Sequence, residues 1–275
     1  MPSHCKPRPV STVEAVLHGL ASRMPAGRRV ALVVAHPDDE TIAAGASLHL
    51  LPGLLLVHVT DGAPRALADA AAAGFDTPSA YAAARRHELM AALQVAGVSP
   101  ELVELGVADQ DASLDMPGLA RMLARLFDAH ATEAVITHAY EGGHPDHDAT
   151  AFAVHAAAGC RPVLEFAGYH AGPDGALRTG RFLPGPAKPS RMRAAPVVVR
   201  LTEPEQARKR AMFDCFRTQA RVLVAFGTSE EKFRLAPSYD FTAPPLPGRL
   251  NYEHWGWSMT GMRWRELARE ALCDA

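Results

Sequence analysis

Short apolar runs alternate with amphipathic stretches along the first two-thirds of the chain. The runs are rich in Val, Leu and Ile and lie at 30–34, 54–60, 102–105, 134–137 and 163–166. Apolar residues at helical spacing predict helices at 11–24, 41–51, 81–96, 116–130 and 145–158. Nearly continuous apolar strands that alternate with helices are typical of parallel sheets. The pattern predicts an α/β fold with a Rossmann-like, mostly parallel sheet flanked by helices and joined by right-handed crossovers.

The last third of the chain is less regular. Gly and Pro punctuate residues 171–196, where no long regular element is expected, and residues 237–248 are irregular as well. A strand at 197–200 and a helix at 203–218 are predicted between these segments. The tryptophans Trp255, Trp257 and Trp264 follow, and they are expected to pack over the core.

Length and composition indicate one soluble globular domain. With 275 residues, of which 48% are hydrophobic and 21% charged, the chain is long enough for a substantial core. We expect a single domain over 1–275, with its core at about 28–220 and a C-terminal elaboration at 221–275. Two turn signals also stand out: Asp61-Gly62 after the second strand and Gly97 after the third helix.

Charge and cysteine usage narrow the function classes. Lys and Arg number 28 against 30 Asp and Glu, which gives no electrostatic case for nucleic acid or an acidic membrane surface. The N-terminal residues lack a signal-peptide pattern, and no run of about 18 apolar residues occurs, so we expect a cytoplasmic protein without a membrane span. The cysteines Cys5, Cys160, Cys215 and Cys273 form no CxxC and are expected to be reduced thiols.

The first polar cluster, Ala35-His36-Pro37-Asp38-Asp39-Glu40, directly follows the first predicted strand. It places an imidazole and three carboxylates at a strand-to-helix turn, where open α/β sheets bind ligands. In a purely structural interpretation, Pro37 opens a helix and the acids complement its dipole. That interpretation explains the acids but not His36.

The second polar cluster follows the fourth predicted strand and contains His144-Pro145-Asp146-His147. Pro145 suits the first position of a helix, and His144 and His147, three residues apart, then share one side of its first turn. Other histidines stand alone and are interpreted as ordinary surface or core residues: His49, His58, His130, His155 and His254.

Together the two clusters contain the donors of a catalytic zinc site. Such a site has three nitrogen or oxygen ligands and an open position for water. His36, one acid of Asp38 and Asp39, and one imidazole of His144 and His147 supply that set. The remaining acid and imidazole suit a general base and a partner for an oxyanion, as amide or ester hydrolysis requires. Periodicity does not decide which neighbour takes which role.

The pair AHPDDE and HPDH, about a hundred residues apart, resembles the LmbE-like or PIG-L family of zinc-dependent N-acetylglucosaminide deacetylases, over roughly residues 28–170. The resemblance implies a Rossmann-like fold with the metal at the strand ends. It also implies roles: His36, Asp39 and His147 as zinc ligands, Asp38 as general base, His144 as the imidazolium that stabilises the tetrahedral intermediate, and Asp146 as the residue that orients His144. One departure is Gly142, where some members carry a tyrosine that Tyr140 would have to replace.

Arg85 is the candidate for holding the substrate. It lies in the first turns of its helix, where positive charge is mildly unfavourable, so it predicts a partner. Glu88 one turn later is one candidate, and a bound ligand is the other. The resemblance favours the ligand, because the matching arginine contacts sugar hydroxyls or the aglycone. An acid after the third strand, Asp109, is then expected to assist.

The expected function is that of a metal-dependent hydrolase. It would remove an acyl group, typically acetyl, from the amide nitrogen of an N-acyl amino sugar or glycoconjugate, with Zn²⁺, Fe²⁺ or another divalent ion. Alternatives are an amidase acting on a non-sugar N-acyl compound and a metallophosphoesterase with two metals. A nucleotide-binding protein is disfavoured because three acids stand where phosphate would bind and no GxGxxG is present. A non-catalytic binding module leaves the presence of both Asp38 and His144 unexplained.

Overall fold

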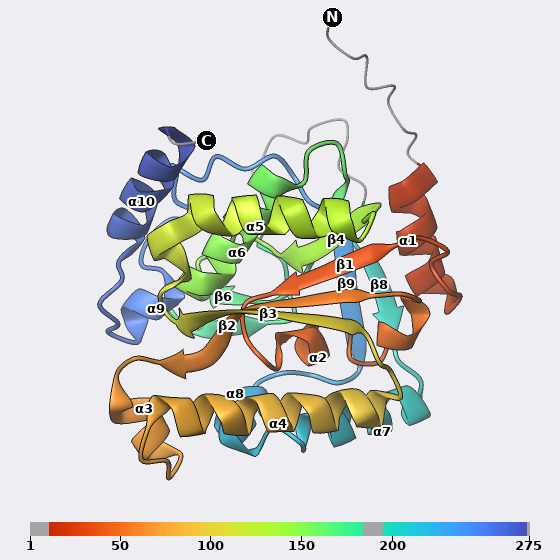
Figure 1. Cartoon of the computed structure of the whole chain (residues 1–275), viewed down its shortest axis with the longest axis horizontal. Helices are drawn as coiled ribbons and strands as arrows, with labels where there is room; N and C mark the ends of the chain where they lie inside the picture. Colours follow the sequence, from red (N-terminus) through yellow and green to blue (C-terminus); the bar gives the residue numbers. More distant parts are fainter. Residues whose placement is uncertain (1–10, 184–194, 274–275) are drawn as a thin grey trace, which may run out of the picture.

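A computed structural model describes residues 11–183 and 195–273. At its centre is a seven-stranded sheet in the order β3-β2-β1-β4-β5-β9-β8 (Figure 1). The first five of these strands run parallel, and β9 is antiparallel to both β5 and β8. The strands are β1 (Val30–Val34), β2 (Leu55–Pro64), β3 (Glu101–Asp109), β4 (Ala134–His138), β5 (Val163–Phe166), β8 (Val197–Arg200) and β9 (Glu230–Leu235), with a separate hairpin of β6 (Tyr169–Ala171) and β7 (Leu177–Thr179).

Helices cover both faces of this sheet (Figure 1). Helices α1, α2, α4 and α7 contribute to the apolar core on one face, and α5, α6 and α10 to the core on the other. The α-helices are α1 (Ser11–Ser22), α2 (Asp39–Ala44), α3 (Leu67–Ala72), α4 (Pro78–Ala96), α5 (Met116–Ala129), α6 (Pro145–Ala157), α7 (Glu203–Phe213), α8 (Ala220–Leu223), α9 (Asn251–His254) and α10 (Gly261–Cys273). Short 3₁₀ turns are η1 (Leu48–Leu50), η2 (Ala112–Asp115) and η3 (Arg217–Gln219). The predicted α/β class with a mostly parallel sheet is confirmed.

The helix predicted at 41–51 is wrong in extent, because α2 ends at Ala44 and a 3₁₀ turn follows. A buried carboxylate interrupts it: Glu231 accepts hydrogen bonds from the Ala46 amide at 2.9 Å and the Ser47 hydroxyl at 2.6 Å. Lys209 neutralises Glu231 from α7 at 2.8 Å. This contact comes from a strand far along the chain, so the local pattern could not reveal it. The helix predicted at 203–218 is likewise shorter and ends at Phe213.

The turn predicted at Asp61-Gly62 is also wrong. Strand β2 continues through it to Pro64, and its pairing with β3 shifts register on both sides of Thr60. Gly62 has a φ of +70°, and a Cβ there would lie 2.5 Å from the Arg85 guanidinium. The glycine therefore marks a bulge that admits an arginine side chain. The stop signal at Gly97 is confirmed, since this residue caps α4 with a φ of +68°.

Strand β9 was not predicted from the sequence. Its residues, EEKFRL, carry four charges in six positions, so they form no apolar run. The charges are accommodated by pairing, as with Glu231 and Lys209. Of the irregular segment 171–196, residues 177–179 form β7, and residues 184–194 lie outside the described part.

The C-terminal tryptophans divide between core and surface. Trp264 is 1% exposed and donates its indole N–H to the Pro145 carbonyl at 3.0 Å, as the prediction of core packing requires. Trp255 is 46% exposed, which contradicts that prediction. The thiols Cys160, Cys215 and Cys273 are free, and Cys5 lies outside the described residues. None of the described helices combines the length and hydropathy needed to cross a bilayer.

The strand order reverses between β1 and β4. Strands β2 and β3 extend the sheet on one side of β1, and β4 and β5 extend it on the other. Leu32 of β1 lies opposite Ile136 of β4, so both strands end at the same level. Ligands of open α/β sheets bind in the crevice at such a switch point. Both polar clusters of the sequence begin there.

Candidate active site

The turn after β1 has a strained backbone held by buried side chains. Asp38 has a φ of +137°, a conformation rarely adopted by residues other than glycine. Its amide donates to Glu40 Oε2 at 3.0 Å, and the same oxygen lies 3.0 Å from His58 Nε2. Both Glu40 and His58 are completely buried. His58 is therefore a partnered core residue, as expected.

The turn after β4 leads directly into a capped helix. His144 is the N-cap of α6, and its Nδ1 accepts a hydrogen bond from the Asp146 amide at 3.1 Å. Pro145 occupies the first helical position, as predicted. Asp148 accepts from the amides of Glu141 and Gly142, both at 3.1 Å. The whole turn is buried beneath the C-terminal segment.

Three side chains from the two turns converge on one point. His36 Nδ1 lies 3.2 Å from Asp39 Oδ2 and 3.2 Å from His147 Nε2, and the latter lies 3.3 Å from Asp39 Oδ1. A tetrahedral zinc ion with bonds of about 2.0–2.1 Å separates its ligand atoms by roughly 3.3 Å. All three residues are buried. The spacing and the nitrogen and oxygen donors therefore fit a divalent metal.

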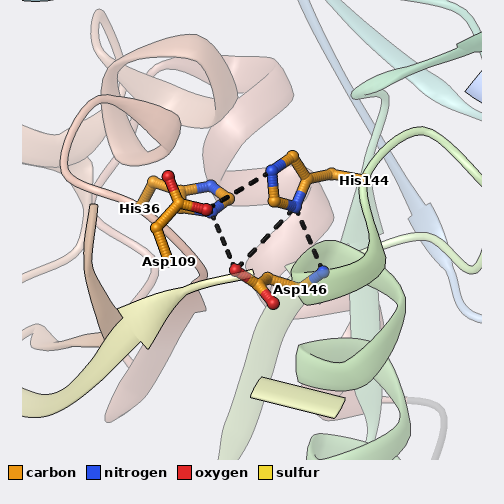
Figure 2. A group of neighbouring side chains, drawn as sticks. All are labelled: His36, Asp109, His144 and Asp146. Carbon is orange, nitrogen blue, oxygen red and sulfur yellow. Dashed lines mark hydrogen bonds and ion pairs between the residues drawn. The ribbon is translucent and has the colours of Figure 1, made fainter. Parts of the chain in front are cut away.

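A second group lies on the other side of the His36 ring (Figure 2). His36 Nε2 is 3.3 Å from Asp109 Oδ1 and 3.3 Å from Asp146 Oδ2. Asp109 Oδ1 is also 3.5 Å from His144 Nε2. Figure 2 shows these four side chains turned toward one another from the β1 turn, the end of β3 and the start of α6. Burial is offset by the nearby imidazoles and the Arg85 guanidinium, and the pKa of Asp109 falls as a result.

Arg85 reaches from α4 to the first turn and is 4% exposed. It donates to Asp38 Oδ2 at 3.0 Å and to the carbonyls of Pro37 at 2.9 Å and Gly62 at 2.6 Å. Burial raises the pKa of Asp38 to about 8, and the guanidinium opposes that rise. The predicted alternative of an Arg85–Glu88 pair is wrong. Glu88 accepts from Thr218 instead, at 2.6 and 3.0 Å.

His144 and Asp146 meet differently from the expected orienting contact. The Asp146 carboxylate lies 3.9 Å from His144 Nδ1, and the backbone amide of Asp146 is the group that hydrogen-bonds to this nitrogen. Burial, together with the positive charge of neighbouring His36, lowers the pKa of His144. A neutral His144 with its proton on Nε2 suits this arrangement, because Nδ1 accepts a hydrogen bond.

All members of the two groups except Asp146 line a cavity of about 700 Å³. Residues from several elements form its outer wall, among them Asp69, Phe75, Tyr81, Tyr169, Arg217, Arg221, Trp255 and Trp257. Tyr140, the residue nearest in sequence to the tyrosine missing at Gly142, does not line the cavity. Its hydroxyl donates to the Ala243 carbonyl at 2.9 Å, and its ring stacks on Trp264 in the core. Gly142 has a φ of +68°, and a Cβ there would lie 2.7 Å from the Leu250 side chain, so a larger residue at this position would be strained.

Sequence reasoning missed two residues beside the site. His138 ends β4, accepts from the Ala35 amide at 3.0 Å and stacks on His147 with ring centroids 3.9 Å apart. Its position at the end of a strand was the available signal. Trp257 meets His144 edge-on at 4.8 Å. No local pattern distinguishes Trp257 from an ordinary core tryptophan.

Comparison with known proteins agrees with this geometry. Residues 31–158 match the family model described as PIG-L, GlcNAc-PI de-N-acetylase. No curated protein sequence matches the chain. Among solved structures, the A40926 pseudoaglycone deacetylase Dbv21 is 20% identical, with 78% of this chain and 98% of that chain covered and a TM-score of 0.59.

Two further structures share the fold. The zinc-inhibited form of the teicoplanin deacetylase Orf2 is 18% identical, covers 77% of this chain and 99% of its own, and has a TM-score of 0.55. The N,N'-diacetylchitobiose deacetylase from Pyrococcus horikoshii, in complex with its inhibitor MPG, is 15% identical, with coverages of 83% and 92% and a TM-score of 0.50. Residues 31–158, which contain both polar turns, are therefore similar to the PIG-L family, and the solved structures share the fold.

Proposed function

We propose that this protein is a divalent-metal-dependent hydrolase that removes an acyl group, acetyl in the first instance, from the amide nitrogen of an N-acyl amino sugar or glycoconjugate. The observation that carries the proposal is the convergence of His36 Nδ1, Asp39 and His147 Nε2 at 3.2–3.3 Å beside the Asp38 carboxylate. The family match and the fold shared with the A40926 pseudoaglycone deacetylase and the N,N'-diacetylchitobiose deacetylase support it.

In this proposal His36, Asp39 and His147 hold the ion. Nitrogen and carboxylate donors suit Zn²⁺ and also accept Fe²⁺ or another divalent metal. When bound, the ion polarises the amide carbonyl and acidifies a water molecule. The three ligands are buried and line the cavity, so the ion would be shielded from bulk solvent.

Asp38 is the proposed general base. Its carboxylate lines the cavity next to the ligand Asp39. It takes a proton from the attacking water and returns it to the departing amine nitrogen. Arg85, 3.0 Å away, favours the ionised carboxylate that this role requires, against the effect of burial. Arg85 therefore acts on Asp38 first, and its remaining N–H groups are the ones available for a substrate hydroxyl.

His144 is the proposed partner of the developing oxyanion. Its Nδ1 accepts the Asp146 amide, so a neutral ring carries its proton on Nε2. The side chain lines the cavity together with His147. A neutral Nε2–H donor stabilises a tetrahedral intermediate without a charged imidazole. Asp109 lines the cavity, with its Oδ1 3.5 Å from His144 Nε2, and is the proposed acceptor for a substrate hydroxyl.

A two-metal phosphoesterase is the weaker candidate. Two-metal sites hold their ions about 3.5–4 Å apart. Here the two groups share only His36, which offers Nδ1 to one and Nε2 to the other, so two ions would be separated by the whole imidazole ring. An amidase for non-sugar amides is tested directly by substrate choice.

The test is an assay of amine release by zinc-loaded protein. N-acetylglucosamine, N,N'-diacetylchitobiose and larger acyl-glucosamine glycosides are compared with N-acetyl amino acids and an aryl phosphate ester. The proposal expects amine release from the glycosides, loss of that activity after chelation, and its recovery with Zn²⁺. Turnover confined to amino-acid amides or to the phosphate ester would overturn it.

A cytoplasmic location is part of the same proposal, supported by the free thiols of the described cysteines.

A further inference from the structure

The two imidazoles of the proposed ligand set, His36 and His147, differ in the contacts of the ring nitrogen that faces away from the ligand group. His147 points Nε2 at the ligand group, and its Nδ1 has no hydrogen-bond partner within 11–183 and 195–273. His36 points Nδ1 at the ligand group, and its Nε2 lies 3.3 Å from carboxylate oxygens of both Asp109 and Asp146. Of these two imidazoles, only His36 therefore has carboxylates next to the ring nitrogen that faces away from the ligand group.

The protonation of His36 follows from this placement. A metal-binding nitrogen must be unprotonated, so a neutral His36 that binds through Nδ1 carries its proton on Nε2. This N–H is buried, because His36 is only 6% exposed, and it needs an acceptor. Carboxylates behind ligating imidazoles fix their orientation and raise their basicity.

Of the two acids, Asp146 is the one with a fixed carboxylate. It is fully buried, and its Oδ2 accepts the Gln110 amide at 2.6 Å while its Oδ1 accepts the Ala112 amide at 3.1 Å. The loop after β3 thus clamps the carboxylate in place. No backbone amide holds the Asp109 carboxylate in this way among the described residues; its oxygens lie 4.0 Å from Arg85 Nη1 and 3.5 Å from His144 Nε2.

We propose that Asp146 is a positioning residue for His36: its carboxylate accepts a hydrogen bond from the Nε2–H of His36 and so orients Nδ1 toward the divalent ion. This inference rests on the metal ligands of the proposed function. It differs from an orienting role toward His144, whose Nδ1 is 3.9 Å from the carboxylate. The contact that His144 does receive, at 3.1 Å, comes from the backbone amide of Asp146, which most substitutions at this position would retain.

The chain offers a matched control in Asp148. It is also fully buried in the first turn of α6, and it also accepts two backbone amides, from Glu141 and Gly142. No histidine contact is found for it among the described residues. Asp146→Ala and Asp148→Ala therefore remove comparable buried carboxylates, and only the first removes the acceptor for His36.

The experiment measures Zn²⁺ affinity by chelator competition, with folding of each apo variant checked by circular dichroism. Asp146→Ala is expected to bind zinc about 10- to 100-fold more weakly than wild type. Asp148→Ala and His144→Ala are expected to keep wild-type affinity. Unchanged affinity in a folded Asp146→Ala protein would overturn the proposal. So would a loss of zinc in His144→Ala, because that would place the ion in the group of Figure 2.

A second measurement needs no variant of Asp146. In zinc-loaded wild-type protein with ¹⁵N-labelled histidine, NMR is expected to find His36 protonated at Nε2, with its signal identified by comparison with His36→Gln. A proton on Nδ1 would overturn the proposal. Neither readout uses a substrate. A failure of the deacetylase proposal would appear as absent amine release with zinc affinities and the His36 tautomer as expected here.

Discussion

The same tripeptide, His-Pro-Asp, occurs in both polar turns, as His36-Pro37-Asp38 after β1 and His144-Pro145-Asp146 after β4. The first stands outside its helix, which begins only at Asp39, and its aspartate has a φ of +137°. The second enters its helix at Pro145, with His144 as the cap. The two histidines consequently face the ligand group differently. His36 is in it, and His144 is beside it.

The difference comes from what surrounds each turn. In the first turn, the Asp38 amide donates to Glu40, and the Asp38 carboxylate accepts from the Arg85 guanidinium. In the second turn, the Asp146 amide donates to His144 Nδ1, and the Asp146 carboxylate accepts from two amides of the loop after β3. One aspartate thus lines the cavity, where we propose it as the base, and the other is fully buried, where we propose it as a support for His36. Identical residues acquire different chemistry from their backbone conformation.

Loss of a proposed ligand should have the largest effect. His36→Ala or His147→Ala is expected to lose stoichiometric zinc and to lower turnover by about 10³-fold or more, because the Lewis-acid contribution is several kcal/mol. Metal content by elemental analysis and amine release measure this. His144→Ala, at the matching histidine of the second tripeptide, is the control for metal content and should keep its zinc. Full zinc content in His147→Ala would show that the ligand set is different.

Substitution of Asp38 should have the next-largest effect on turnover. Asp38→Asn is expected to keep zinc and to lower kcat by roughly 10²- to 10⁴-fold, since a general acid–base group is lost. The readouts are kcat and zinc content of the same preparation. Zinc loss in this variant would make Asp38 a ligand. Nearly normal kcat would assign the base elsewhere.

Arg85 should have an intermediate effect through Asp38. Arg85→Ala is expected to lower kcat/KM by about 1.5–3 kcal/mol, the range for a hydrogen bond to a charged group, with zinc content unchanged. The guanidinium lowers the pKa of Asp38, so its removal raises that pKa. Because the base must be ionised, the acidic limb of the pH profile should move to higher pH.

Glu88→Gln is the control for this shift. Glu88 binds Thr218 rather than Arg85, so the acidic limb should stay where it is in wild type. An Arg85→Ala protein with a raised KM and an unmoved limb would indicate that Arg85 holds the substrate alone.

The prolines should show the smallest effect. Pro145→Ala is expected to lower the free energy of unfolding by about 0.4–1 kcal/mol, because a proline already suited to the first helical position restricts the unfolded chain. Urea unfolding of the apo protein measures this. Zinc content should not change, since Pro145 is outside the proposed ligand set and alanine keeps the carbonyl that accepts from Trp264. A loss of several kcal/mol would mean that the proline ring itself shapes the second turn.

Local patterns were sufficient for the parallel half of the sheet and for bringing the two turns together. Strands β1 and β5 are apolar runs whose bounds match the prediction, and the strand ends place His36 and His147 at one edge. Such patterns work because these strands are buried on both faces.

Long-range pairing set the limits of the sequence analysis. Strand β9 and the end of α2 both depend on Glu231, which meets Lys209 and Ser47 from distant parts of the chain. The contact of Asp146 with His36 is also long-range and has no local signature. Within one turn, spacing did not distinguish ligand from neighbour. The placement of the Asp38 and Asp39 carboxylates depends on the backbone φ of +137° at Asp38, and hydrophobic periodicity does not predict that angle.

The most direct test of the account is anomalous diffraction at the zinc edge from crystals of zinc-loaded protein. The account predicts one strong peak per chain, bonded to His36 Nδ1, Asp39 and His147 Nε2. A peak bonded instead to His36 Nε2, Asp109, His144 and Asp146 would contradict it, because these residues would then replace Asp39 and His147 as ligands.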